Sequence, residues 1–256
     1  MGNGVKCMNE SLIKHHLEKY KRDILMQIQH NTLLKYAGMP VIDEERLFFT
    51  LLPMLNGEQW DDSNNQATIA VSLIFAALAA HDLVKEQNAT TKEQQLQVLA
   101  GDYYSGKYYQ LLAKGKQLEL IQIFSAGVSS ITEHKTKFYD HLAYPFEDLI
   151  QSIQLIESKP IEQFMEYFSY HEYIFIMKEA LLLIALRREL HAFENREETF
   201  YIRNSFLLQT KIDLLREEIE TVENNLVREV RYSTILKENV KHAILERVTE
   251  QAIKSS

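Results

Sequence analysis

The sequence predicts an all-α protein, folded as a single-domain helical bundle over residues 1–256. It contains 8 glycines and 4 prolines, where average usage of the two would give roughly 31 in a chain of this length. Neither residue occurs from Ile161 to Ser256. β-Sandwiches, barrels and Rossmann domains need glycine and proline at their turns and phosphate loops. The composition therefore argues against those classes.

Apolar residues recur at helical spacing along the chain. The first such pattern ends before a break at Gly38 and Pro40. The polar run 61–65 offers several N-caps, and the Ala- and Leu-rich segment after it is typical of a central, buried helix. We predict helices over residues 12–28, 47–55, 67–84, 96–112, 118–138, 146–156 and 161–193.

Residues 200–256 form a charged C-terminal helical part. Apolar residues between 208 and 226 are spaced four and three apart, which is a heptad seam flanked by Glu, Lys and Arg. The seam lasts for under three heptads, whereas sustained coiled coils usually show more. Two interpretations stay open: the seam packs within this chain, or it packs on a partner.

Charge and cysteine content indicate the setting. The formal net charge is −8 and no cluster of Lys and Arg stands out, so we expect no nucleic-acid partner. The single cysteine fits a reducing compartment. The apolar segment 67–80 is shorter than the about 20 residues of a membrane helix, and the first residues lack the apolar core of a signal peptide. We expect a cytoplasmic protein without a transmembrane segment.

Common catalytic motifs are missing from the sequence. It contains no GxxxxGK[ST] phosphate loop, no GxSxG nucleophile elbow and no HExxH metal motif. Nine histidines are present, but none is placed in a metal-binding pattern. The sequence therefore predicts no catalytic residue and no metal site of these kinds.

Two segments resemble a known family. Residues 73–82 read LIFAALAAHD, and residues 98–109 read VLAGDYYSGKYY. In this order they resemble the helix that leads into the first aspartate-rich motif, and the next helix, of the trans-prenyltransferases. The most specific resemblance is to component I, the small subunit of the two-component heptaprenyl diphosphate synthases of Gram-positive bacteria. It covers roughly residues 67–115 and implies the isoprenoid synthase fold.

The chain departs from this family at the aspartate-rich motif. Where catalytic members have DDxxD, it reads Asp82-Leu83-Val84-Lys85-Glu86, and no second DDxxD follows. Two carboxylates at most remain, and a lysine inside the motif competes with a divalent cation. The resemblance therefore implies a degenerate first motif of His81, Asp82 and Glu86. It also implies that this chain binds no metal or cofactor, and that Mg²⁺ belongs to a partner.

The resemblance further implies the activity and the partner. Component I pairs with the catalytic component II, and the two extend farnesyl diphosphate with isopentenyl diphosphate to a C35 polyprenyl diphosphate for menaquinone biosynthesis. We expect this chain to be a regulatory or structural subunit, inactive alone, that shapes the dimer and the product tunnel. A homodimer of the isolated chain and peripheral membrane contact of the assembled enzyme are left open.

The second segment supplies the expected partner interface or product tunnel. Tyrosines four residues apart share one face of a helix, glycines allow close helix approach, and aromatic residues are typical interface anchors. The candidate residues are Gly101, Asp102, Tyr103, Tyr104, Gly106, Tyr108 and Tyr109. The alternatives are that the tyrosines cover this chain's own core, and that Asp102 begins its helix and complements the positive N-terminal dipole.

Two other functions are kept as alternatives. One is a self-sufficient terpenoid or prenyl synthase with an unrecognised metal site. The other is a helical scaffold protein unrelated to isoprenoids. Product formation by the purified chain alone separates the first from the subunit hypothesis, and failure to bind or activate a component II separates the second.

Overall fold

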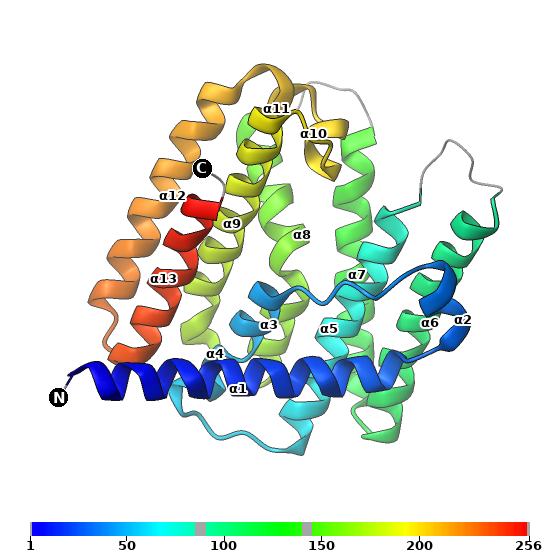
Figure 1. Ribbon diagram of the computed structural model, residues 1–256, viewed down its shortest axis with the longest axis horizontal. Coiled ribbons are helices and arrows are strands. Elements are labelled where there is room, and N and C mark those ends of the chain that lie inside the picture. The colour runs from blue at the N-terminus through cyan, green and yellow to red at the C-terminus, as the bar shows by residue number, and fades with distance from the viewer. Residues whose placement is uncertain (1, 85–90, 140–144, 255–256) are drawn as a thin grey trace. The chain divides into compact units, whose positions relative to one another are not determined.

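The computed structural model describes residues 2–84, 91–139 and 145–254. Every regular element in these ranges is helical (Figure 1), so the all-α prediction is confirmed. The chain divides into two compact units, Met1–Ser125 and Ala126–Ser256. The expectation of a single domain stays a prediction.

The first unit is built around one buried helix. Its helices are α1 (Gly2–Ile28), α2 (Asn31–Tyr36), α3 (Glu44–Thr50), α4 (Leu52–Asn56), α5 (Asp62–Asp82), α6 (Lys92–Lys114) and the start of α7 (Leu118–Tyr139). Helix α5 packs against α1, α3 and α6, and most of its Ala, Leu and Ile side chains are buried. This confirms the prediction of a central helix at this point in the chain.

A capping box fixes the start of α5. The Asp61 carboxylate accepts hydrogen bonds from the backbone N–H groups of Ser63 at 2.8 Å and Asn64 at 3.1 Å. Asn64 Oδ1 in turn accepts from the N–H of Asp61 at 3.0 Å. Both exchanges satisfy N–H groups that the first turn of a helix leaves without partners. The polar run 61–65 thus serves as the predicted cap.

Helices α5 and α6 run antiparallel, with a side-chain bond at each end of the pair. Gln97 Nε2 donates to the carbonyl of Ala80 at 3.2 Å at one end. Gln117 Nε2, just beyond α6, donates to the carbonyl of Ser63 at 3.2 Å at the other. A Cβ added to Gly115 would overlap the side-chain amide of Gln66. The two helices therefore approach closely along their length.

The second unit consists of long helices that pack around α9. It contains the rest of α7, α8 (Phe146–Tyr167), the 3₁₀ turn η1 (His171–Tyr173), α9 (Ile174–Asn195), α10 (Phe200–Asn204), α11 (Phe206–Thr210), α12 (Ile212–Tyr232) and α13 (Glu238–Lys254). Helix α9 contacts α8, α12 and α13 (Figure 1).

The predicted helix boundary at Pro160 is wrong. Helix α8 continues through Pro160 to Tyr167, and the break comes at 168–173. Pro160 lacks the N–H of one helical hydrogen bond, and it is buried, as are Ile161 and Phe164. The actual break has Ser169 in the left-handed region at φ +61°, which the sequence does not signal because no glycine is present.

The heptad seam packs internally. Helix α12 lies against α9, and the seam residues Leu215, Val222 and Leu226 are buried. Arg187 of α9 completes the contact, because its Nη2 lies 2.6 Å from Glu223 Oε2 of α12 and its Nη1 donates to the carbonyl of Val248 in α13. The first of the two interpretations left open for the seam is therefore confirmed.

Two glycines in long helices allow a matched test of helix packing. Gly106 of α6 has no heavy atom within 4 Å of an added Cβ, whereas a Cβ on Gly127 of α7 would overlap the buried amide of Gln163. Gly106→Ala should stabilise the chain by about 0.5–1 kcal/mol through helix propensity. Gly127→Ala should destabilise it by about 1–3 kcal/mol through overpacking. Urea unfolding of both variants measures the difference; shifts of the same sign would contradict this packing.

Candidate functional site

The two segments that the sequence singled out meet at the C-terminal end of α5. The imidazole of His81 lies against Gly101 of α6, where an added Cβ would stand 2.5 Å from His81 Cε1 and Nε2. The bond from Gln97 to the Ala80 carbonyl holds this end of the pair together. Gly101 thus allows the close helix approach that we predicted, and the helix that approaches α6 is α5 of the same chain.

His81 and Asp102 face each other without a hydrogen bond. His81 Nε2 is 3.8 Å from Asp102 Oδ1, and the two side chains are 41% and 65% exposed. This distance is too long for a hydrogen bond, and an exposed ion pair of this kind, formed only when the imidazole is protonated, stabilises little. The pair is open to solvent and is not a buried catalytic dyad.

The carboxylate of Asp82 lies on the last residue of α5. It is half-buried, and the next residue, Leu83, exposes 53% of its surface. Glu86 and Lys85, the remaining residues of the degenerate motif, lie outside the described residues. Within the ranges that are described, no group of three or more His, Cys, Asp or Glu side chains is placed to hold a metal ion. The donors described here do not fit a Mg²⁺ site, which needs several oxygen ligands in octahedral geometry.

The prediction that Asp102 begins its helix is wrong. Helix α6 starts at Lys92, and its N-cap is Thr91, whose hydroxyl accepts from the backbone N–H of Gln94 at 3.3 Å. Asp102 therefore lies in the helix interior, beyond the first turn in which a carboxylate complements the dipole. Its side chain faces His81 instead.

The four tyrosines of α6 divide into two pairs. Tyr104 and Tyr108 are 3% and 2% exposed, and burial raises the pKa of both phenols. Tyr109 is 40% exposed, stacks on Tyr108 with ring centres 4.2 Å apart and donates to Ser125 Oγ of α7 at 3.3 Å. Tyr103 packs edge-on against His30 at 5.4 Å. Tyr104 and Tyr108 thus fill this chain's own core, the alternative that the sequence left open.

An outward stripe of α6 remains uncovered. Leu99, Asp102, Gly106 and Tyr109 follow one another at intervals of three and four residues, so they share one helix face, and all four are exposed. Leu99 exposes 54% of its surface, and Gly106 has no neighbour within 4 Å of an added Cβ. Leu99 was missed by the sequence analysis, although its spacing from Gly106 and Tyr109 was a usable signal. We refer to these four residues as the α6 stripe.

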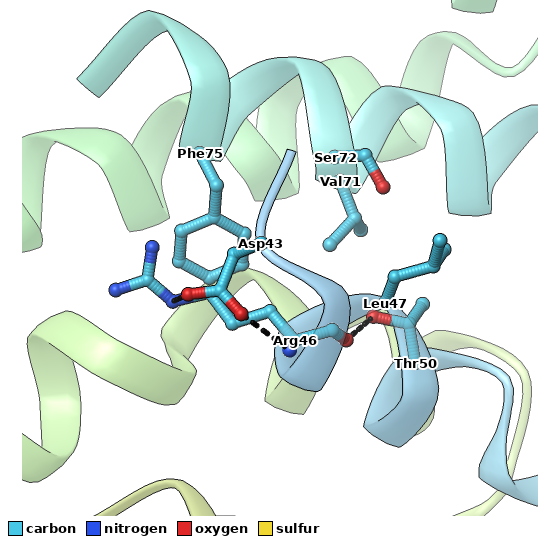
Figure 2. A pocket seen from close by; sticks show the side chains of 7 residues that line it. All are labelled: Asp43, Arg46, Leu47, Thr50, Val71, Ser72 and Phe75. Carbon is cyan, nitrogen blue, oxygen red and sulfur yellow. Dashed lines mark hydrogen bonds and ion pairs between the residues drawn. The ribbon is translucent and has the colours of Figure 1, made fainter. Parts of the chain in front are cut away.

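A small hollow lies between α3 and α5 (Figure 2). The Arg46 guanidinium stacks on the Phe75 ring at 4.2 Å, and Arg46 Nε is 3.8 Å from Asp43 Oδ2. The hollow has a volume of about 10 Å³, which is the room of one water molecule. It does not admit an isoprenoid diphosphate.

Two buried carboxylates in the second unit were not found by sequence reasoning. Glu157 of α8 accepts from Tyr201 Oη at 2.8 Å and from Arg188 Nη2 at 3.2 Å. Glu189 of α9 accepts from the N–H of Ile202 at 3.2 Å and from the Thr199 hydroxyl. Both carboxylates tie α10 to the long helices. Burial raises the pKa of Glu189, although the Thr199 bond works in the opposite direction.

Solved structures define the class of fold. A decaprenyl diphosphate synthase from Rhodobacter capsulatus superposes with a TM-score of 0.71 over 98% of this chain and 99% of its own, at 11% sequence identity. A heptaprenyl diphosphate synthase from Staphylococcus aureus gives a TM-score of 0.70 over 95% of this chain and 99% of its own, also at 11% identity. The fold is that of the trans-prenyltransferases, as the sequence predicted.

The family model described as heptaprenyl diphosphate synthase (HEPPP synthase) subunit 1 matches residues 30–237. The chain belongs to this family. Heptaprenyl diphosphate synthase component 1 of Geobacillus stearothermophilus is 38% identical over 106 residues, which are 41% of this chain and 48% of the relative. The chain thus spans about half the length of the curated relative that it matches. The family membership argues against a scaffold unrelated to isoprenoids.

Helix α5 is also long and apolar enough, by length and composition, to cross a membrane. In the protein, 61% of its apolar stretch is buried. The sequence prediction considered only residues 67–80 and therefore did not identify the whole helix as long enough to span a membrane. The core helix of a soluble protein meets the same criterion, so length and composition alone do not assign α5 to a membrane.

The buried network predicts a pH-dependent difference between two variants. Because the pKa of Glu189 is raised by folding, its ionisation opposes folding as pH rises. Glu189→Gln keeps an acceptor for the Ile202 N–H and should become more stable relative to wild type as pH rises above about 4.5. Urea unfolding from about pH 3.5 to about pH 7.5 measures this trend.

Glu162→Gln is the matched control with the opposite sign. Burial raises the pKa of Glu162, but hydrogen bonds from Lys178 and Lys159 outweigh it and the net pKa is lowered. The ionised carboxylate therefore stabilises the fold above its unfolded pKa, and this contribution is lost as pH falls. Glu162→Gln should cost most near neutral pH and least in acid. Parallel trends for the two variants would contradict this electrostatic picture.

Proposed function

We propose that this chain is the non-catalytic subunit of a two-component heptaprenyl diphosphate synthase and acts in a heterodimer with a catalytic component II. The family membership and the trans-prenyltransferase fold support the proposal. The observation that carries it is the end of α5, where Asp82 is followed by the exposed apolar Leu83. Cytoplasmic location and the lack of a nucleic-acid partner belong to the same proposal.

The proposed reaction extends farnesyl diphosphate with isopentenyl diphosphate to a C35 polyprenyl diphosphate, for the side chain of menaquinone. Ionising an allylic diphosphate needs cations that stabilise the leaving group. In this proposal the aspartate-rich motifs of component II hold Mg²⁺, which supplies that stabilisation. This chain contributes part of the wall of the product tunnel and a surface for dimerisation.

The α6 stripe is the surface that we assign to the partner. The buried Tyr104 and Tyr108 anchor α6 from behind in this chain's own unit, so the helix presents its outer face without rearrangement. The stripe combines the apolar Leu99, the aromatic Tyr109 and the flat surface of Gly106. Interfaces favour such a combination, since aromatic anchors bury large areas and glycine lets helices approach closely.

Reconstitution with a component II tests the function. The chain alone, with Mg²⁺, farnesyl diphosphate and isopentenyl diphosphate, should give no polyprenyl product. Addition of a component II should give a long-chain product, measured by radiolabel incorporation and chromatography of chain length. Product from the chain alone would favour a self-sufficient synthase, and no binding or activation of component II would overturn the proposal.

Gly106 allows a test of the interface that spares the fold. Gly106→Trp places a large side chain on the stripe where no neighbour of the same chain is close, and it should weaken component II binding by at least about tenfold through steric exclusion. Gly106→Ala is the control and should bind within about threefold of wild type. Titration calorimetry measures both, with thermal melting of the isolated variants alongside. Equal affinity of the Trp variant and wild type would exclude the stripe.

A further inference from the structure

Near the start of α6, lysine side chains of α2 and α6 lie over a tyrosine ring. Helix α2 packs on α6 (Figure 1). The ring of Tyr36 lies 4.2 Å from Lys92 Nζ and 5.1 Å from Lys35 Nζ. Fifteen residues further along α6, about 22 Å by helical rise, Lys107 Nζ lies 5.3 Å from the ring of Tyr103. Lys35 and Lys92 thus lie together on one α2–α6 surface of a chain whose formal net charge is −8.

The lysines of this surface keep their charge available to an outside partner. No ion pair is formed by Lys35, Lys92 or Lys107 within the part of the chain that the structure describes. Acidic residues on the same helix are Glu93 and Asp102, and the carboxylate of Asp102 faces His81. Lysines that stack on tyrosine rings are also held in place by the cation–π attraction.

Exposed apolar side chains follow Lys35 and Tyr36 in the chain. The segment after α2 turns at Gly38, with φ +81°, and presents Met39 and Val41 at 67% and 54% exposure. The anchor of α2 is separate, because Leu33 is buried. Lysine, tyrosine and adjacent apolar side chains are the combination that occupies the headgroup region of a bilayer, with the apolar groups at the acyl boundary.

We propose that the α2–α6 surface, defined by Lys35, Tyr36, Met39, Val41 and Lys92, binds the surface of an anionic lipid bilayer. Charge complementarity selects the occupant, because anionic headgroups attract each juxtaposed lysine. A free phosphate would use the lysines but not Met39 and Val41, whereas a bilayer uses both.

Vesicle co-sedimentation of the full chain tests the proposal without partner or substrate. Vesicles of phosphatidylcholine with roughly one-third phosphatidylglycerol should bind the chain at least about tenfold more tightly than phosphatidylcholine alone. Binding should fall steeply when salt is raised from about 0.1 M to about 0.5 M. Equal binding to the two kinds of vesicle, or none to either, would overturn the proposal.

Substitutions distinguish binding through this surface from a general effect of the protein's net charge. Lys35→Gln with Lys92→Gln should weaken binding by roughly 25-fold, at about fivefold per lysine. Met39→Ser with Val41→Ser should weaken it by at least about tenfold. The control, Lys211→Gln with Lys237→Gln in the second unit, changes the net charge equally and should bind as wild type. Equal losses in the control would contradict the assignment.

A competition arm distinguishes the lipid surface from free phosphate. Inorganic phosphate at the ionic strength of a chloride control should displace the chain from vesicles no more than chloride does. Specific displacement by phosphate, together with unchanged binding of the Met39 and Val41 variant, would show a phosphate site and overturn the lipid proposal. Because the assay contains no component II, failure here is distinguishable from failure of the synthase proposal.

Discussion

The close approach of α5 and α6 is the contact on which the first unit depends. Missing side chains at Gly101 and Gly115 let His81 and Gln66 of α5 lie directly on α6. The bonds made by Gln97 and Gln117 fix the register at the two ends. Once the register is fixed, helical geometry decides the other faces of α6: one carries the buried tyrosines, one meets α2, and one stays open to water.

Much of the fold could be predicted because helical periodicity is a local property. The central helix, its cap at Asp61 and the charged C-terminal helix follow from spacing and from turn-forming residues. The break at Ser169 was mispredicted because a serine in the left-handed region has no unique sequence signal. The start of α6 was placed too late, although Thr91 and Gln94 match the S/T-x-x-E/Q pattern of a capping box. The partner of the heptad seam depended on tertiary packing, which periodicity alone does not specify.

The residues of the candidate site could be predicted from the sequence, but the directions in which their side chains point could not. The segments that carry the family resemblance do meet, because α5 and α6 are consecutive antiparallel helices. The sequence could not decide which tyrosines face inward, since that depends on the rotation of α6 against α5. Nor could it find Glu157 and Glu189, whose partners Tyr201 and Ile202 come from a later segment of the chain.

Glycine occupies only some of the left-handed positions in the described part of the chain: Gly38 and Gly57 have positive φ, but so do three residues that carry a side chain. Ser169 and Arg196 adopt positive φ at helix ends of the second unit without glycine, although a side chain there costs roughly 1–2 kcal/mol. Gly101, Gly115 and Gly127 instead lie where a Cβ would meet a neighbouring side chain. Sites for a fluorescent or spin label therefore belong at the turns, where Arg196 is exposed and replaceable. A label at Gly101 or Gly127 would displace the neighbouring side chain, whereas Gly106 leaves room for one.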